Sequence, residues 1–249
     1  TSGSLIWTYT NPDGYRYVFA PCVDKDGYVY IWCEIDAASN PQKSVIRKLD
    51  PSNGGLLATS TNIGTWMNGR EQLTYDPSRH KIYIGQYGGM IKQIDPSTLA
   101  VDWVYYVPYE PGTGGSFKTL QFYNGALYAL CSTTPLKLCK INVVSRTLDW
   151  SYSHADINPE IRNYFHIEND KIYVPYNSTT ITALDINTGI EIPSERVLAP
   201  SAYMDGEVYL TSLDDVIKYS DNFWVYAGKE YNSTYRRVHT VKTKIKILA

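Results

Sequence analysis

Several features that would assign a function are missing from this sequence. No stretch approaches the roughly 18–20 consecutive apolar residues that a membrane span needs. The formal net charge is −2, which creates no field that would attract nucleic acid or an anionic membrane. We therefore expect neither a nucleic-acid partner nor a membrane span.

Motifs of catalysis and metal binding are equally scarce. The sequence has no Gly-x-Ser-x-Gly elbow and no phosphate-binding loop. Its four histidines are scattered without metal-ligand spacing. Asp24 and Asp26 begin a series like that of a calcium loop, but the series stops there, so a hairpin turn is the better interpretation. We predict no catalytic residue, no metal site and no cofactor.

Phenylalanine and helical periodicity are scarce as well. The chain has only 5 Phe against 23 Tyr, and its apolar residues repeat with a period of two, which is typical of strands. Tyrosine favours strands and carries a polar tip, so it suits sheet faces and contact surfaces. The sequence predicts an all-β protein, and 249 residues can bury the core of a single domain over residues 1–249.

A repeated pattern runs through the chain. A turn is followed by a strand carrying apolar-Tyr-apolar, then a strand ending in apolar-Asp or apolar-Asn, a Ser/Thr/Gly turn and a strand often marked by Trp. The anchoring tyrosines are Tyr30, Tyr83, Tyr128, Tyr173 and Tyr209. Their spacings of 53, 45, 45 and 36 residues average near the roughly 40–50 of one propeller blade. The repeat predicts a single β-propeller of four-stranded blades.

The ends of the chain bear on the number of blades. Residues 5–9 resemble an outermost strand with no blade before it, and residues 235–248 hold two alternating runs. Because an open ring would expose sheet edges, we expect the N-terminal strand to complete the last blade and close the ring. This interpretation gives about six blades, and a five-bladed ring with an irregular tail is the alternative.

The turn before the last strand of the repeat carries a family resemblance. Its pattern is apolar-Asp-x-x-Thr-Gly followed by Trp; residues 184–189 match it best, and residues 94–98 with Trp103 come next. The pattern resembles the repeats of the pyrroloquinoline-quinone-type (quinoprotein-like) β-propellers, which include eight-bladed quinone dehydrogenases and cofactor-free scaffolding and surface proteins. The chain is too short for eight blades and lacks an adjacent cysteine pair, so the resemblance implies the cofactor-free branch and sets the architecture alone.

The four cysteines form two local pairs. Cys131 and Cys139 are symmetric about a proline in a predicted hairpin, where they would face each other across the strands. Cys22 and Cys33 flank the first turn of the repeat, and a two-residue loop there would place them on one face, one diagonal apart. Four buried free thiols are the alternative. Disulfides would indicate an oxidising, extracellular setting.

Two glycosylation sequons begin at Asn177 and Asn232 and favour the same setting. We therefore expect an exported glycoprotein on a cell, appendage or virion surface, as part of a larger assembly or alone.

A cation precedes four of the anchoring tyrosines at a comparable distance. These cations are Arg16, Arg70, Lys118 and Arg162. Each lies near the start of an innermost strand, where propellers place ligand sites at the mouth of the central channel. Guanidinium groups bind carboxylate or phosphate bidentately, so this set predicts an anionic ligand. Solvated loop charges are the alternative.

Aromatic side chains occur on the longer loops that approach the same rim. They include Trp66 and Tyr109, and His154 lies on a neighbouring loop. Exposed aromatics on loops would make a contact surface for carbohydrate or protein, whereas packing over the base of their own loop is the alternative.

Taken together, these patterns favour a binding protein over an enzyme. We predict a non-enzymatic recognition or structural module that binds a protein or an anionic glycan. A propeller hydrolase or lyase acting on carbohydrate or lactone substrates at the channel mouth is the alternative, and a periplasmic-type scaffold is a third hypothesis.

Overall fold

All the regular structure in the described part of the chain is β-strand. The computed structural model describes residues 6–10, 12, 21–36, 43–64, 73–86, 88–108, 116–132, 137–153, 165–175, 180–198, 201–204, 207–212 and 215–217. They form four four-stranded sheets and one three-stranded sheet, each built from consecutive antiparallel strands. No helix in these residues is long and apolar enough to cross a membrane. The chain divides into two compact units, Thr1–Tyr164 and Phe165–Ala249.

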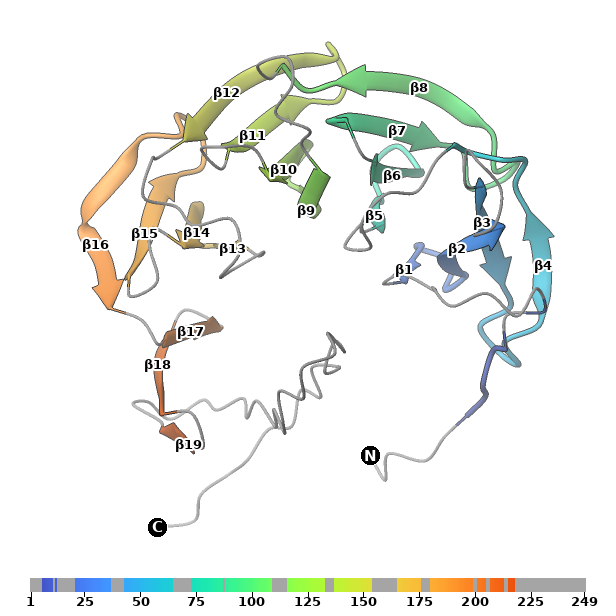
Figure 1. Ribbon diagram of the computed structural model, residues 1–249, viewed down its shortest axis with the longest axis horizontal. Helices are drawn as coiled ribbons and strands as arrows, with labels where there is room; N and C mark the ends of the chain where they lie inside the picture. Colours follow the sequence, from blue (N-terminus) through green and yellow to red (C-terminus); the bar gives the residue numbers. More distant parts are fainter. Residues whose placement is uncertain are drawn as a thin grey trace. The chain divides into compact units, whose positions relative to one another are not determined.

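The first unit contains three sheets (Figure 1). The first sheet has β1 (Cys22–Val23), β2 (Val29–Asp36), β3 (Lys43–Leu49) and β4 (Leu56–Thr59). The second sheet has β5 (Leu73–Asp76), β6 (Lys81–Gln86), β7 (Met90–Ile94) and β8 (Val101–Tyr106). The third sheet has β9 (Ser116–Tyr123), β10 (Ala126–Ser132), β11 (Lys137–Asn142) and β12 (Thr147–Ser153).

The second unit contains the remaining two sheets. The fourth sheet has β13 (His166–Glu168), β14 (Lys171–Pro175), β15 (Thr180–Asp185) and β16 (Glu191–Leu198). The fifth sheet has β17 (Ser201–Met204), β18 (Glu207–Ser212) and β19 (Asp215–Ile217). The antiparallel four-stranded sheets confirm the predicted all-β class and the four-stranded repeat.

The turn that opens each repeat varies in length from sheet to sheet. Asn124 and Gly125, both with positive φ, make a two-residue loop between β9 and β10. In the first sheet, the backbone N–H of Asp24 donates to the carbonyl of Tyr28, so three residues form the loop, and Gly27 takes φ +88°. Such a three-residue loop with a left-handed glycine is a common hairpin type, and it shifts the register of the following strand by one residue relative to a two-residue loop.

The turn before the last strand has one architecture in four sheets. In each, an Asp or Asn side chain accepts hydrogen bonds from the backbone two residues on, as predicted from the sequence. The residues that open these turns are Asp50, Asp95, Asn142 and Asp185. A later residue of each turn is left-handed: Gly54, Leu99, Arg146 and Gly189. The sequence match between residues 94–98 and 184–189 therefore corresponds to a shared backbone conformation.

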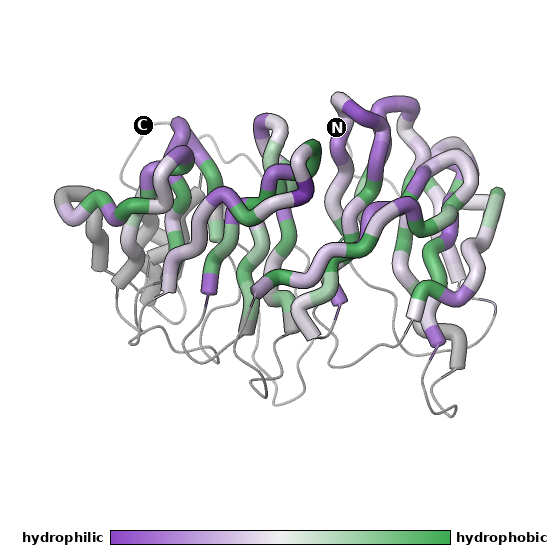
Figure 2. The backbone as a smooth tube through the Cα atoms, turned by 90° about the horizontal axis from the view of Figure 1, so that it is seen from above, coloured by the Kyte–Doolittle hydropathy of each residue, from purple (hydrophilic) through white to green (hydrophobic). Residues whose placement is uncertain are grey.

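The four anchoring tyrosines whose side chains are described are core residues. Tyr30 and Tyr83 are fully buried, Tyr128 is 2% exposed and Tyr173 is 9% exposed, whereas Tyr209 lies in a part whose side chains are not described. In the first unit, β1 and β2 contact β5, and β5 and β6 contact β9, so adjacent sheets pack face to face. Figure 2 shows hydrophilic residues at many of the turns and hydrophobic residues along the strands.

The N-terminal residues 6–10 pack on the face of the first sheet that points away from the second. Trp7 and Tyr9 cover a buried cluster that includes Ile31 and Cys33. The Trp7 indole donates to the carbonyl of Pro51 at 2.9 Å. The C-terminal strands that would pair with this segment to close a ring lie outside the described residues, so ring closure stays a prediction.

The register separates the first pair of cysteines. Cys22 pairs with Tyr30, because the loop between β1 and β2 has three residues instead of the expected two. Cys22 therefore packs on the face towards the second sheet, and Cys33 packs on the opposite face. The expected placement of Cys22 and Cys33 on one face is wrong.

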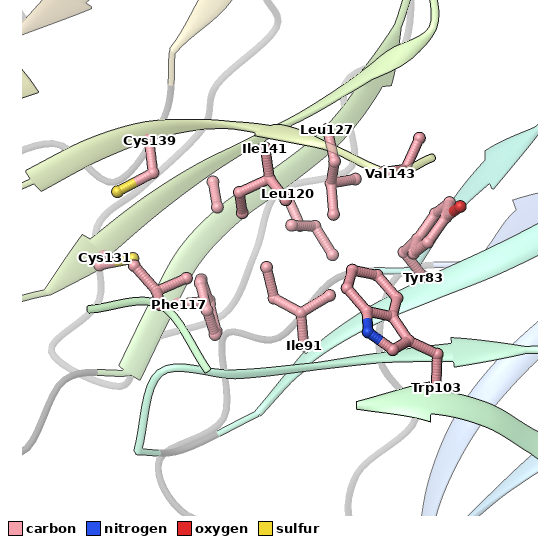
Figure 3. Packing of buried hydrophobic residues seen from close by; sticks show 12 residues of the cluster. Tyr83, Ile91, Trp103, Phe117, Leu120, Leu127, Cys131, Cys139, Ile141 and Val143 are labelled. Atoms are coloured by element: carbon pink, nitrogen blue, oxygen red, sulfur yellow. The ribbon is translucent and has the colours of Figure 1, made fainter. Parts of the chain in front are cut away.

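The second pair of cysteines lies on one face of the third sheet. Cys139 pairs directly with Ala129, which leaves Cys131 one diagonal away and not directly opposite as predicted. Both thiols are buried and free, and a hydrogen bond between them, together with burial, raises the pKa of Cys131 (Figure 3). A disulfide between Cys131 and Cys139 stays a prediction.

Candidate functional site

The candidate site is the interface between the first and second sheets. Its centre is apolar: the fully buried Trp32 and Ile46 of the first sheet pack with Ile82, Ile84 and Ile94 of the second. Polar side chains lie between the sheets at both ends of this interface. We call the end at the β1–β2 and β5–β6 turns the turn end, and the end near Gln86 the glutamine end.

At the turn end, a buried aspartate organises the loop of the first sheet. Asp24 is only 6% exposed, and its Oδ1 accepts hydrogen bonds from the backbone N–H groups of Asp26 and Tyr28, at 2.9 and 3.0 Å. Its Oδ2 accepts a bond of 2.8 Å from the hydroxyl of Tyr30. Burial, followed by this bond to the carboxylate, raises the pKa of Tyr30, so the hydroxyl remains a donor. Asp24 is thus an acceptor held by three donors.

The same end brings in a histidine from the second sheet. His80, with φ +52°, is the last residue of the β5–β6 turn. Its Nδ1 lies 2.8 Å from the hydroxyl of Tyr75, which also accepts from the backbone N–H of Lys25. The Tyr75 hydroxyl therefore links the ring of His80 to the loop of the first sheet.

The Cys22 thiol lies beside this polar group. Burial and the charge of Asp24 raise the pKa of Cys22 to about 12. A thiol with such a pKa stays protonated at neutral pH, and the protonated form is a weak nucleophile.

At the glutamine end, two side chains converge on one carbonyl. Gln86 is fully buried, and its Nε2 donates to the carbonyl of Ile63 at 3.3 Å. The ammonium of Lys92 donates to the same carbonyl. The Oε1 of Gln86 is buried, and no donor among the described residues bonds to it. The neighbouring Gly64 carbonyl accepts a bond of 2.8 Å from the Ser44 hydroxyl, which fixes this loop on the first sheet.

Lys92 is the unusual charge of the interface. Burial lowers its pKa, and the described residues offer no carboxylate within ion-pair distance of its ammonium. A Cβ at Gly64 would lie 3.0 Å from Lys92 Nζ and 3.5 Å from Gln86 Oε1, so the glycine allows both groups to lie close to the loop. The glutamine end therefore presents an ammonium with spare protons beside an unused amide acceptor.

The predicted ligand residues do not belong to this described geometry. Arg16, Trp66, Arg70, Tyr109, His154 and Arg162 lie outside the described residues, as do both sequons, Asn177 and Asn232. The backbone of Lys118 belongs to β9, although its side chain is not described. The convergence of these cations stays a prediction.

Sequence reasoning missed the residues that the structure does bring together. Lys92 and Gln86 lie within strands, where an alternating pattern predicts only which face a side chain is on. The one available signal was the presence of a lysine and a glutamine on the face that also carries Ile84 and Ile94.

The fold and the interface define a β-propeller repeat protein, a class in which four-stranded antiparallel sheets repeat along the chain. No protein family and no curated protein matches the sequence. Many solved structures match the fold, among them BamB from Moraxella catarrhalis, with a TM-score of 0.50 over 79% of this chain and 74% of that one. At 12% identity, this similarity shows the fold alone.

Proposed function

We propose that this chain is a non-enzymatic recognition module that binds an anionic partner at the glutamine end. The observation that carries the proposal is Lys92, a partly buried ammonium with no described counter-ion, beside the unused Oε1 of Gln86. Burying an ammonium without a counter-ion and an amide oxygen without a donor is unfavourable, and a ligand carboxylate or sulfate together with a hydroxyl or amide donor would satisfy both.

The proposed partner is an acidic glycan or an acidic segment of a protein. Lys92 and Gln86 lie at the end of the second sheet where β5 begins, and the predicted cations Arg70 and Lys118 precede or begin the inner strands β5 and β9. Cations gathered there would add to the attraction of an anion. Salt would screen this attraction, because the Lys92 ammonium is only partly buried.

Substitution of Lys92 by Met tests the proposal. The probes are sulfated and uronic-acid oligosaccharides and an acidic peptide, with a neutral oligosaccharide as the negative probe, measured by calorimetry at low and high salt. We expect Kd for the anionic probe that binds to rise by about tenfold or more in Lys92→Met, because a charge-assisted hydrogen bond contributes about 1.5–3 kcal/mol. Added salt should weaken binding to the unsubstituted protein.

Lys81→Met is the matched control, because it removes an equal charge from the same sheet. Lys81 Nζ is already paired with Asp95 and Asp102, at 2.7 and 2.6 Å. Its substitution should leave the binding of the anionic probe within about twofold of the unsubstituted protein. If both variants lost the same affinity for the anionic probe, the effect would come from net charge alone, and a site at Lys92 would be refuted.

We also propose that the ring closes through the N-terminal segment, with about six blades. Deleting residues 240–249 should then lower Tm, because it removes strands from the last blade. An unchanged Tm would contradict closure.

An exported surface location is proposed from the two sequons, and loss of mass on glycosidase treatment of the native protein would test it.

A further inference from the structure

Three potential metal ligands meet at the turn end of the interface. Asp24 and Asp26 come from the β1–β2 loop of the first sheet, and His80 comes from the β5–β6 turn of the second. One carboxylate oxygen from each aspartate and one ring nitrogen of the histidine lie within 4.8 Å of one another. The cluster combines oxygen and nitrogen ligands and spans two sheets.

These separations suit one small divalent ion. Metal–ligand bonds of about 2.0–2.2 Å place two ligand atoms about 3.4 Å apart at a tetrahedral angle and about 4.2 Å apart when opposite. Asp24 is buried and held by three hydrogen bonds, so it would be the fixed ligand. The exposed Asp26 can change rotamer and close the remaining gap.

The surroundings of His80 prepare it for metal binding. The hydroxyl of Tyr75 engages Nδ1, which leaves Nε2 as the nitrogen for an ion. Metal-binding histidines usually have their second ring nitrogen held in this way, because the bond fixes the ring orientation and the tautomer. Tyr75 would therefore be a positioning residue for the site.

One side chain competes with a metal for the aspartates. The ammonium of Lys25 lies 2.8 Å from Oδ1 and 2.9 Å from Oδ2 of Asp26, and this contact lowers the pKa of Asp26. Both partners are about half exposed, so this ion pair is weak and an ion can displace the lysine. Among the described residues, Tyr30 alone donates to Asp24 Oδ2, which leaves a lone pair for an ion.

We propose that Asp24, Asp26 and His80 form a binding site for a divalent transition-metal ion, with Zn²⁺ as the probe. An imidazole with two carboxylates suits zinc and its neighbours, whereas Ca²⁺ prefers six to eight oxygen ligands. The ion joins the first sheet to the second. Three protein ligands leave at least one position for water or for a carboxylate of a partner.

The experiment is a titration of the metal-free chain with Zn²⁺ by calorimetry, with Tm measured in parallel. We expect one ion per chain at this site and a Tm that rises with the ion, because only the folded chain brings the ligands together. His80→Asn should abolish this binding, and asparagine is chosen because it tolerates the left-handed backbone at this position. Asp26→Asn should raise Kd about tenfold or more, as the loss of one ligand does.

Two further variants make the test specific. Lys25→Ala should lower Kd for Zn²⁺, because it removes the competing ammonium, and a structural defect would not have this effect. Asp102→Asn is the matched control. Asp102 is paired with a lysine, Lys81, as Asp26 is paired with Lys25, but no described histidine lies beside it. The Kd of Asp102→Asn for Zn²⁺ should equal that of the unsubstituted protein.

The proposal is overturned by the absence of stoichiometric Zn²⁺ binding, or by binding that His80→Asn leaves intact. Ca²⁺ that binds as tightly as Zn²⁺ and is insensitive to His80→Asn would equally refute a transition-metal site. If His80→Asn does not fold, the opposite shifts expected for Lys25→Ala and Asp26→Asn decide the question, since both residues are exposed loop positions.

Discussion

The two sheet–sheet interfaces of the first unit are built differently. Between the second and third sheets an apolar cluster dominates the packing, and Figure 3 shows Ile91 between Trp103 and Phe117 in it. The polar contacts there have partners, as in the bond from the Phe122 N–H to the Thr74 hydroxyl. The rings of Tyr83 and Phe122 stack there, with centroids 6.3 Å apart. Between the first and second sheets, the apolar centre is bounded by charged and amide groups.

This difference shows how a repeat can separate stability from binding. An apolar interface gains free energy in proportion to the area that it removes from water, so it is the part that holds the sheets together. Polar groups between sheets lose hydration and gain less net free energy, so they add little stability unless they are all paired. The Oε1 of Gln86, which bonds to no described donor, is the observation at the first interface that motivates the proposed binding site.

The largest effect is expected at the apolar interface. Phe117 is 1% exposed, and Phe117→Ala should lower the free energy of unfolding by about 3–5 kcal/mol through lost burial and a cavity. Gly85 faces the same ring: an added Cβ would lie 2.7 Å from Phe117 Cγ, so Gly85→Ala should cost about 1–3 kcal/mol by overpacking. Urea unfolding measures both.

A double-mutant cycle then tests whether this contact is the cause. In the Phe117→Ala background, Gly85→Ala should cost much less or even recover stability, because the added methyl occupies the cavity. Additive costs would show that the two residues do not share a contact.

Cys131 and Cys139 belong to the apolar cluster between the second and third sheets. Oxidation that links Cys131 to Cys139 should stabilise the chain by about 2–3 kcal/mol, since the loop that it closes is short. The diagonal placement requires the two Cβ atoms to move closer, which would reduce this gain. Non-reducing mass spectrometry of the native protein detects the link. Alkylation of all four thiols without prior reduction would contradict both the disulfide and the expected oxidising setting.

The polar interface should respond to the loss of one hydroxyl. Tyr30→Phe removes the donor to Asp24 Oδ2 and leaves a buried carboxylate oxygen without that bond, which should cost about 1–3 kcal/mol. Tyr106→Phe is the control, because Tyr106 is 64% exposed and should change stability by less than about 0.5 kcal/mol. Similar changes in unfolding free energy for both variants would show that Asp24 does not organise this end of the interface.

The smallest effect is expected at a partly exposed ion pair of the second sheet. The Lys81 ammonium, followed by bonds from the backbone of the turn, lowers the pKa of Asp95 to about 2. An acid with a pKa near 3.9 when unfolded and about 2 when folded contributes stability above pH ~4 and loses it as the pH falls towards 2. Because the pair is partly exposed, the contribution should be below about 1 kcal/mol.

Asp95→Asn isolates this charge, since the amide oxygen can still accept the turn bonds that Asp95 Oδ1 receives from Ser97 and Thr98. The difference in unfolding free energy between the two proteins should be present at pH 6 and disappear near pH 2. A difference that is independent of pH would assign the effect to the turn and not to the ion pair.

Much of the fold could be predicted because it depends on local chemistry. The tyrosine of each repeat and the Asp or Asn that begins a turn were identified from the repeated pattern, and those that the structure describes take the expected places, as Tyr83 and Asp185 illustrate. The loop between β1 and β2 could not be predicted, because two-residue and three-residue loops both suit an Asp-Gly pair. The one additional loop residue places Cys22 on the face opposite to that of Cys33.

The candidate sites could not be predicted, because their members come from different sheets. His80 follows Asp26 by 54 residues, so no ligand spacing connects them. Lys92 and Gln86 meet through the carbonyl of Ile63, which belongs to another sheet's loop and has no side-chain signature.

The sequence by itself determined the class of strand-rich repeat, the anchoring tyrosines and the chemistry of the turns. Each of these depends on interactions between residues a few positions apart, whose side chains alternate with a period of two. Tertiary structure alone decided which polar groups meet: the packing of the first sheet on the second brings Asp24 to His80 and Gln86 to Ile63. Such contacts depend on the rotation and register of whole sheets, and these are set by the summed burial of apolar side chains rather than by any local pattern.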